Sequence, residues 1–408
     1  MNIGFIGLGK LGMPCAEVMA QKGHTVKGYD IYPRTSDDLT VVSSIQECVA
    51  EAEIVFIAVP TPHDPAYDGR APTAHLEPKN FDYTTVETCL QEANKYMNRN
   101  QLLVLISTVL PGTTRGRFIK LVPNTNFVYN PYLIAMGSVA WDMANPEMVM
   151  VGTKDGSETG QAKLLIDFYK TIMENDPRYV VGTWDECECI KVFYNTFISA
   201  KIGLVNMIQD VAEKQGNIDV DVVTKALSES TMRIMGPQYM KAGMGDGGAC
   251  HPRDNIALRY LANTLGLGYD LFSSIMQARE IQAENLALKL VNLAKEYDQS
   301  RIYIHGKAYK PGVEYTDGSY SLLIGHYCQQ LGYPVIYIDP LTGDNVNEAK
   351  GVILLAHNQQ VTYDYRGNIA EQSLYCKIMP RSVVLDPWRT FESEDKTLIV
   401  IPYGNTRE

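Results

Sequence analysis

Residues 1–12 read MNIGFIGLGKLG, and this stretch decides the fold of the first part of the chain. Its first six residues predict a buried strand, and the glycines that follow have the G-x-G-x-x-G spacing that places a dinucleotide pyrophosphate on a helix N-terminus. The next predicted strand, residues 25–30, ends in an aspartate, which would bind the adenosine ribose and repel a 2′-phosphate. We therefore expect an NAD-binding Rossmann domain, with cofactor contacts at Gly7, Gly9, Lys10, Leu11, Gly12 and Asp30.

The predicted sheet continues through strands at residues 53–59, 102–106, 126–129 and 147–152. Two segments follow strands at the carboxyl edge, where sheets of this class bind their ligands. They are residues 59–61, Val-Pro-Thr, and residues 107–114, STVLPGTT. We expect them to approach the cofactor through Val59, Pro60, Thr61 and Thr108, and Thr108 also has a hydroxyl suited to the reaction centre. The alternative for residues 107–114 is a plain helix cap.

A different pattern begins near Trp184. Residues 184–213 and 270–296 each predict a long apolar-periodic helix, which suits a dimerisation spine between two α/β halves. Lys191 and Asn195 are spaced i,i+4 on the first helix and share one face, from which they could polarise a substrate oxygen. The alternative is a solvated lysine beside a surface asparagine.

Residues 243–254 read GMGDGGACHPRD. Glycines at this density let backbone N–H groups approach a ligand, and Cys250 at the end of the loop is a candidate nucleophile. Asp254, at the start of a predicted helix, could orient a water or the thiol. The alternative is a glycine-rich turn with an inert buried cysteine.

The α/β alternation resumes after residue 300, with strands at 301–305, 334–339, 351–355 and 382–385 and a helix at 319–331. This predicts a second Rossmann-like domain without the glycine fingerprint, in which Lys310 either contacts phosphate or is simply solvated. The predicted fold is α/β, with two Rossmann-like doubly wound parallel-sheet domains joined by a long-helix central domain. We place the boundaries at 1–182, 183–297 and 298–408.

Composition and net charge argue against several classes of function. The net charge of −11 argues against a nucleic-acid binder, and no apolar run has the length of a membrane span. The eight cysteines are scattered and the seven histidines show no ligand spacing, so we expect reduced thiols, a cytoplasmic protein and no metal site.

The order of these motifs resembles that of the UDP-glucose/GDP-mannose 6-dehydrogenase family. GLGKLG, AVPTP, ISTVLPGTT, NPYLIAMG, the Lys191–Asn195 pair, GMGDGGACHPRD and GKAYKPG follow one another along most of the chain. The resemblance implies an NAD-dependent, four-electron oxidation at C6 of a nucleotide sugar, with UDP-glucose as the default substrate, by a homodimer. It further implies a thiohemiacetal and then a thioester on Cys250, an oxyanion held by Lys191 and Asn195, and a water placed by Asp254 and Thr108.

The resemblance also implies substrate contacts, at Tyr132, Leu133, Lys191, Asn195, Arg233, Tyr239, Gly243, Gly247 and Lys310. Tyr132 and Met136 stand where the family has glutamates, the first of which is the usual candidate base for thioester hydrolysis. Two alternatives follow. The short span between Asp30 and the next long strand is closer to two-electron 3-hydroxyacid dehydrogenases, and the missing glutamates would suit a catalytically weak nucleotide-sugar binding protein.

Overall fold

The computed structural model describes residues 1–62, 64–65, 77, 79–135, 137–158, 160–236, 242–245, 250–358, 362–363, 369–370 and 374–405. The chain divides into two compact units, Met1–Lys201 and Ile202–Glu408, and the boundary falls inside the long helix α6 (Trp184–Gln215). The three domain boundaries expected from the sequence stay a prediction. Within the described ranges, no helix is long and apolar enough to cross a membrane.

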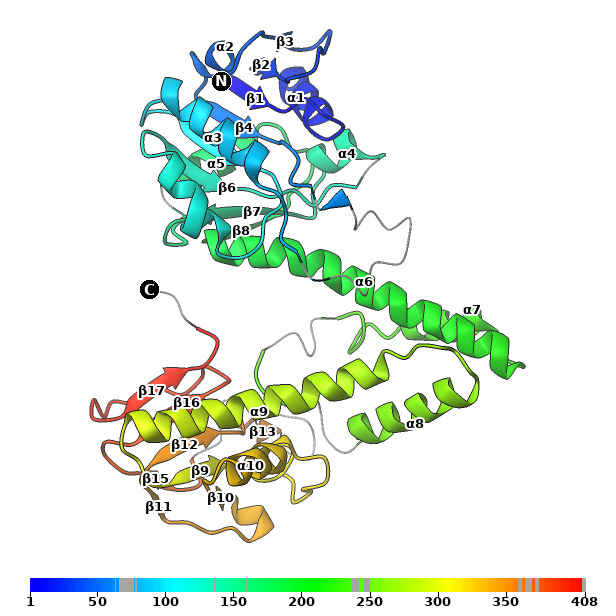
Figure 1. Cartoon of the computed structure of the whole chain (residues 1–408), viewed down its shortest axis with the longest axis vertical. Coiled ribbons are helices and arrows are strands. Elements are labelled where there is room, and N and C mark those ends of the chain that lie inside the picture. Colours follow the sequence, from blue (N-terminus) through cyan, green and yellow to red (C-terminus); the bar gives the residue numbers. More distant parts are fainter. Residues whose placement is uncertain are drawn as a thin grey trace. The chain divides into compact units, whose positions relative to one another are not determined.

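The first unit is built on one eight-stranded sheet (Figure 1). Six of its strands are parallel in the Rossmann order β3-β2-β1-β4-β5-β6, so the order reverses between β1 and β4, where such sheets bind dinucleotides. The last two strands run the other way, because β7 is antiparallel to β6 and β8 is parallel to β7. The bounds are β1 Asn2–Ile6, β2 Thr25–Tyr29, β3 Thr40–Val41, β4 Ile54–Ile57, β5 Leu102–Leu105, β6 Asn126–Tyr129, β7 Met148–Thr153 and β8 Arg178–Thr183.

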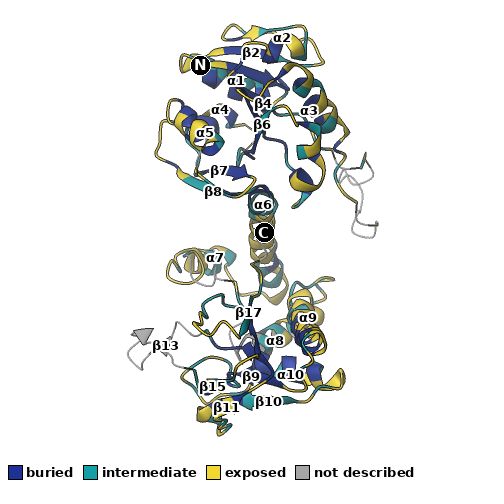
Figure 2. Cartoon of the chain, turned by 90° about the vertical axis from the view of Figure 1, so that its left-hand side faces the viewer, coloured by how far each residue is buried: buried dark blue, intermediate teal, exposed yellow. Residues whose placement is uncertain are grey.

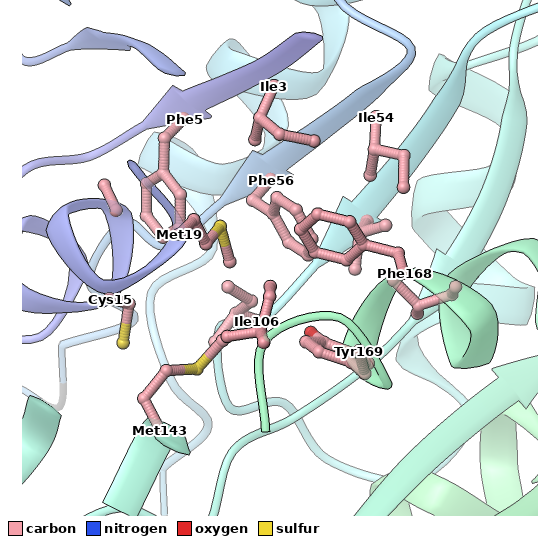
Figure 3. Close-up of a cluster of buried hydrophobic side chains, with 14 of the residues drawn as sticks. Ile3, Phe5, Cys15, Met19, Ile54, Phe56, Ile106, Met143, Phe168 and Tyr169 are labelled. Carbon is pink, nitrogen blue, oxygen red and sulfur yellow. The ribbon is translucent and has the colours of Figure 1, made fainter. Parts of the chain in front are cut away.

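Helices cover both faces of this sheet, and Figure 2 shows them on its two sides. One core packs α1, α4 and α5 against one face, and Figure 3 shows Phe5, Phe56 and Phe168 meeting there. The Phe5 and Phe56 ring centroids are 5.7 Å apart. The second core packs α2, α3 and the start of α6 against the other face. The bounds are α1 Gly12–Gln21, α2 Ile45–Val49, α3 Thr84–Tyr96, α4 Val139–Ala144 and α5 Gln161–Tyr169, with a π-helical turn at Thr114–Phe118 and a 3-10 turn at Ile119–Leu121.

Helix α6 begins at a capping box. The Glu186 N–H donates to the Thr183 hydroxyl over 3.3 Å, and the Thr183 N–H donates to the Glu186 carboxylate over 2.8 Å. This reciprocal pair satisfies amide groups that the first helical turn leaves without partners. The long helix expected over residues 184–213 is thereby confirmed, with its start fixed by local chemistry.

The second unit combines helices with a five-stranded parallel sheet in the order β10-β9-β12-β16-β17. In chain order this is the 2-1-3-4-5 arrangement, whose ligand site lies between the first and third strands, here β9 and β12. The core on one face contains α9 and α10, and loop residues such as Leu374 and Phe391 pack on the other. The main bounds are α7 Val220–Ser228, α8 Cys250–Thr264, α9 Phe272–Glu296, β9 Ile302–His305, α10 Tyr320–Gln330, β10 Val335–Ile338, β12 Val352–Leu355, β16 Val383–Asp386 and β17 Ile399–Pro402.

Short elements complete this unit. They are a 3-10 turn at Pro340–Thr342, the pair β11 (Glu348–Ala349) and β15 (Lys377–Ile378), and the pair β13 (Thr362–Tyr363) and β14 (Ile369–Ala370).

Candidate active site

The glycine loop after β1 has the geometry of a dinucleotide cradle. Gly7 adopts a φ of +97°, and a Cβ on Gly12 would lie 1.8 Å from the Gly7 carbonyl oxygen, so the first turn of α1 packs directly on the end of the strand. A Cβ on Gly9 would meet nothing within 4 Å. The loop is therefore tight on its protein side and open at Gly9, as a pyrophosphate over the start of α1 requires.

Asp30 lies at this loop, directly after β2. One carboxylate oxygen accepts the Leu8 N–H over 2.8 Å and the other accepts the Tyr32 N–H over 2.9 Å. The Arg34 Nε is 3.8 Å from the same Asp30 oxygen that Tyr32 contacts. Two amides thus orient the acid expected to bind the ribose, and a guanidinium stands beside it.

The loops after β4 and β5 are joined by hydrogen bonds. The Ser107 hydroxyl donates to the Val59 carbonyl over 2.6 Å, and the Thr61 hydroxyl donates to the Thr108 carbonyl over 2.7 Å. Because β4 lies beside β1, β5 lies beside β4 and all three strands are parallel, these loops and the glycine loop share one edge. The residues expected at the cofactor are therefore brought together, and Ser107 joins them as a residue that sequence reasoning missed.

Lys191 lies at the same edge. Its Nζ donates to the Tyr132 carbonyl over 2.7 Å, which fastens α6 to the segment after β6. Partial burial lowers the pKa of the Lys191 ammonium. Asn195, one turn further along α6, is exposed. The pair thus combines a partly desolvated cation with an accessible amide, a combination able to stabilise an oxyanion.

The Tyr132 side chain belongs to the core of the unit. Its hydroxyl lies 2.8 Å from the Tyr169 hydroxyl, which donates to the Asn130 side-chain oxygen, and the Asn130 amide donates to the Met150 carbonyl over 2.6 Å. Burial raises the pKa of the Tyr132 phenol well above its ordinary value. The group that Tyr132 offers to the site is therefore its backbone carbonyl. Leu133 beside it is half-buried, and Met136 lies outside the described residues.

The remaining predicted residues belong to the second unit. Cys250 is the first residue of α8 and Asp254 lies in the same helix, as expected, while their side chains lie outside the described part of the structure. Arg233 and Lys310 are exposed, and the Lys310 Nζ lies 5.5 Å from the centre of the Tyr309 ring. Tyr239 and Gly247 are also outside the described residues.

Gly243, at the start of the loop before Cys250, is packed against the C-terminal sheet. A Cβ on Gly243 would lie 2.1 Å from the Trp388 ring, and the Arg389 guanidinium donates to the Ala242 carbonyl over 2.5 Å. Trp388 itself donates from its indole nitrogen to the Ala356 carbonyl, directly after β12, over 3.1 Å. The loop thus begins at the edge where a 2-1-3-4-5 sheet binds its ligand.

The second sheet, like the first, has a glycine loop after one strand that is held by an aspartate after the neighbouring strand. Gly306 follows β9 with a φ of +100°, and Asp339, after β10, accepts the N–H groups of Lys307 and Ala308 over 3.0 Å each. Asp339 is fully buried, and its other oxygen accepts the Leu341 N–H over 3.2 Å. This acid is fully buried and accepts three backbone N–H groups, so it holds its loop and its carboxylate is not exposed to a ligand.

Comparison with known proteins agrees with this layout. The model of the UDP-glucose/GDP-mannose dehydrogenase family NAD binding domain matches residues 32–173, and the central-domain model of the same family matches residues 185–280. UDP-glucose 6-dehydrogenase YwqF of Bacillus subtilis is 26% identical over 385 residues, which cover 86% of this chain and 82% of that protein. UDP-glucose 6-dehydrogenase of Rickettsia typhi is 27% identical over 347 residues, covering 77% and 75% of the two chains.

Among solved structures, the GDP-mannose dehydrogenase of Pseudomonas aeruginosa superposes with a TM-score of 0.77 at 20% identity, covering 98% of this chain and 99% of that one. This likeness confirms the expected fold class, and the NAD-binding match confirms the expected cofactor. The chain belongs to the UDP-glucose/GDP-mannose dehydrogenase family and is an NAD-dependent oxidoreductase.

Proposed function

We propose that the chain oxidises the C6 alcohol of a nucleotide sugar to the uronic acid, with UDP-glucose as the first substrate to test. The observation that carries the proposal is the placement of Lys191. It is partly desolvated and lies at the carboxyl end of β6, on the same sheet edge as the cofactor loops after β1, β4 and β5. A cation fixed beside the NAD-binding edge suits an alcohol that loses a hydride while negative charge builds on its oxygen.

The proposed reaction has two oxidations. NAD would accept one hydride in each oxidation. In the first, the C6 alcohol loses a hydride and a proton and becomes an aldehyde, while Lys191 and Asn195 stabilise the oxygen. In the second, the Cys250 thiolate adds to the aldehyde carbon, and the thiohemiacetal loses a hydride to give a thioester.

Water then attacks the acyl carbon, the carbon–sulfur bond breaks, and the thiolate is regenerated. One alcohol, two NAD⁺ and one water give one carboxylate, two NADH and three protons. We assign the positioning of this water to Asp254 and Thr108. The Tyr132 hydroxyl is hydrogen-bonded to the Tyr169 hydroxyl in the core, so Tyr132 supplies no general base for the attacking water. We therefore expect thioester hydrolysis to be the rate-limiting step.

The test is a stoichiometric assay of purified protein with NAD and a panel of UDP- and GDP-sugars. We expect two NADH for each acid formed, and a sugar adduct on Cys250 in rapidly quenched samples examined by intact-protein mass spectrometry. Cys250→Ser should stop acid formation, because a serine hydroxyl is a far weaker nucleophile than a thiolate. Cys189→Ser, at a half-buried cysteine on α6, is the matched control and should retain turnover.

Other outcomes separate the alternatives. One NADH per substrate with no dependence on Cys250 would indicate a 3-hydroxyacid-type dehydrogenase. Calorimetric binding of nucleotide sugars without NADH formation would indicate a binding protein. Steady acid formation without any adduct would contradict slow thioester hydrolysis.

A further inference from the structure

Glu188 is a fully buried carboxylate on α6, one turn before Lys191. Its two oxygens accept the backbone N–H groups of Gly112 over 2.6 Å and Thr114 over 2.8 Å. Hydrogen bonds from N–H groups to an ionised carboxylate are stronger than those between neutral groups. Burial nevertheless raises the pKa of Glu188, so the carboxylate is kept at this position against a desolvation cost.

The segment that Glu188 holds is the continuation of the loop that contains Thr108. Gly112 turns the chain with a φ of +87°, and the π-helical turn Thr114–Phe118 begins at once, which leaves amide groups in need of acceptors. On its other side the segment is fixed by Tyr83, whose hydroxyl accepts the Leu110 N–H over 3.1 Å. The loop is therefore clamped between α3 and α6.

The same helix thus makes two attachments to the sheet edge. Glu188 ties α6 to the segment after β5, and Lys191, three residues later, ties it to the segment after β6 through the Tyr132 carbonyl. The Thr108 carbonyl in turn anchors Thr61 of the loop after β4. We propose that Glu188 is a positioning residue that fixes Thr108 relative to Lys191, and this inference rests on the proposed function.

An acid suits this role because both partners of Glu188 are donors, and an ionised carboxylate is acceptor-only. In Glu188→Gln one oxygen becomes an NH₂ group that faces a backbone N–H, so one of the two bonds is lost. We expect kcat to fall by between about 10- and 100-fold, the loss typical of a sub-ångström to 1 Å displacement of reacting groups. The KM for NAD should stay within about twofold, because the two amides that Glu188 holds, at Gly112 and Thr114, are not among the expected cofactor contacts.

Three comparisons distinguish positioning from a merely structural effect. Glu188→Asp keeps the charge and should recover part of the lost kcat. Glu186→Gln, in the capping box one half-turn earlier, is the matched control and should leave kcat unchanged in the folded fraction. A double-mutant cycle should show that Glu188→Gln and Thr108→Ala together cost less than the sum of the single effects. Additive effects, or a kcat loss equal to the fraction unfolded, would overturn the inference.

A second readout needs no turnover. Hydrogen exchange of the Gly112 and Thr114 amides should be at least tenfold faster in Glu188→Gln, while amides of β5 keep their protection. Unchanged protection at these two amides would also overturn the inference. The parent protein could oxidise no nucleotide sugar while the two amides still exchange faster in Glu188→Gln. That result would contradict the proposed function but support the role of Glu188 in holding this segment.

Discussion

We expect Asp30 to decide between NAD and NADP, and Arg34 to allow that preference to be changed by mutation. In the parent protein the carboxylate lies 3.8 Å from the Arg34 Nε and would repel a 2′-phosphate. We expect NAD to be clearly preferred, and Asp30→Ser to raise kcat/KM for NADP by about tenfold, because the guanidinium is then free to meet a phosphate. Steady-state kinetics with both cofactors measure this change. In Asp30→Ser/Arg34→Ala the gain should vanish, and an equal use of both cofactors by the parent would refute the role of Asp30.

Lys191 should set the alkaline limit of activity. In the proposed mechanism its charged form stabilises the oxyanion. Burial lowers the pKa of Lys191, so the charge is lost at a lower pH than for a solvated lysine. The pH profile of kcat should therefore fall on its alkaline side below the ordinary lysine pKa. Lys191→Arg should be slower but keep its activity to higher pH, because a guanidinium stays protonated. An alkaline limb that does not move in this variant would show that another group titrates.

Tyr132 should matter for stability more than for chemistry. In Tyr132→Phe the Tyr169 hydroxyl keeps its bond to Asn130, so we expect a loss of about 1 kcal/mol in the free energy of unfolding and turnover within about twofold. Tyr169→Phe breaks the chain at its centre and should cost more, because it leaves the Asn130 oxygen unpaired. Urea unfolding compares the two variants. A collapse of turnover in Tyr132→Phe would place its hydroxyl in the reaction.

The sequence predicted which residues lie along the cofactor edge of the first sheet but not how they are held. Spacing placed Lys191 and Asn195 on one helix face, yet the partner of Lys191 is a backbone carbonyl 59 residues away, which no local pattern contains. Glu188 was missed for the same reason. The sequence feature that could have identified Glu188 is an acidic residue three positions before Lys191, on a helix face that the apolar periodicity assigns to the core.

At the scale of elements, the turn from β1 into α1 contains one glycine that is needed for packing and another that is expected to be needed only for cofactor binding. Gly9→Ala adds a methyl group where nothing lies within 4 Å, so we expect an unchanged melting temperature and at least tenfold weaker NAD binding. Gly12→Ala forces a Cβ to within 1.8 Å of the Gly7 carbonyl, so it should lower both the melting temperature and the affinity. Thermal unfolding and cofactor titration of each variant check this contrast. Equal behaviour of the two would contradict the geometry.

Most central strands and both long helices were predicted within a few residues, because continuous apolar runs and 3.6-residue periodicity are local signals. The elements that were missed are strands β8 and β17, the two-residue strands, and helices α2, α4, α5 and α7. The reversed direction of β7 and β8 also had no counterpart in the prediction, since strand pairing is settled by contacts between distant segments. A helix cap at residues 107–114 would open an α-helix, and the structure has instead a π-helical turn followed by a 3-10 turn.

At the scale of the molecule, α6 presents an apolar surface to solvent. Phe193 and Phe197 are 54% and 59% exposed, and Ile198, in the same stretch, is 44% exposed. Exposed apolar side chains in a row are typical of an interface, and we predict a two-fold homodimer through this helix. Phe193→Glu/Phe197→Glu should yield a monomer by light scattering at micromolar concentration. Trp141→Glu, at a 63% exposed residue of α4, is the matched control and should remain dimeric. A monomeric parent protein would contradict the prediction.

The contact between Gly243 and Trp388 has a consequence for recombining this protein with its relatives. An indole ring that leaves no space for a Cβ makes the segment before Cys250 and the turn after β16 a matched set, although 145 positions of sequence separate them. A chimera that imports a C-terminal sheet should therefore import residues 242–245 with it. A crossover placed between the two would pair a foreign turn with the native glycine, or a foreign side chain with the native indole. Either graft should loosen the segment before Cys250.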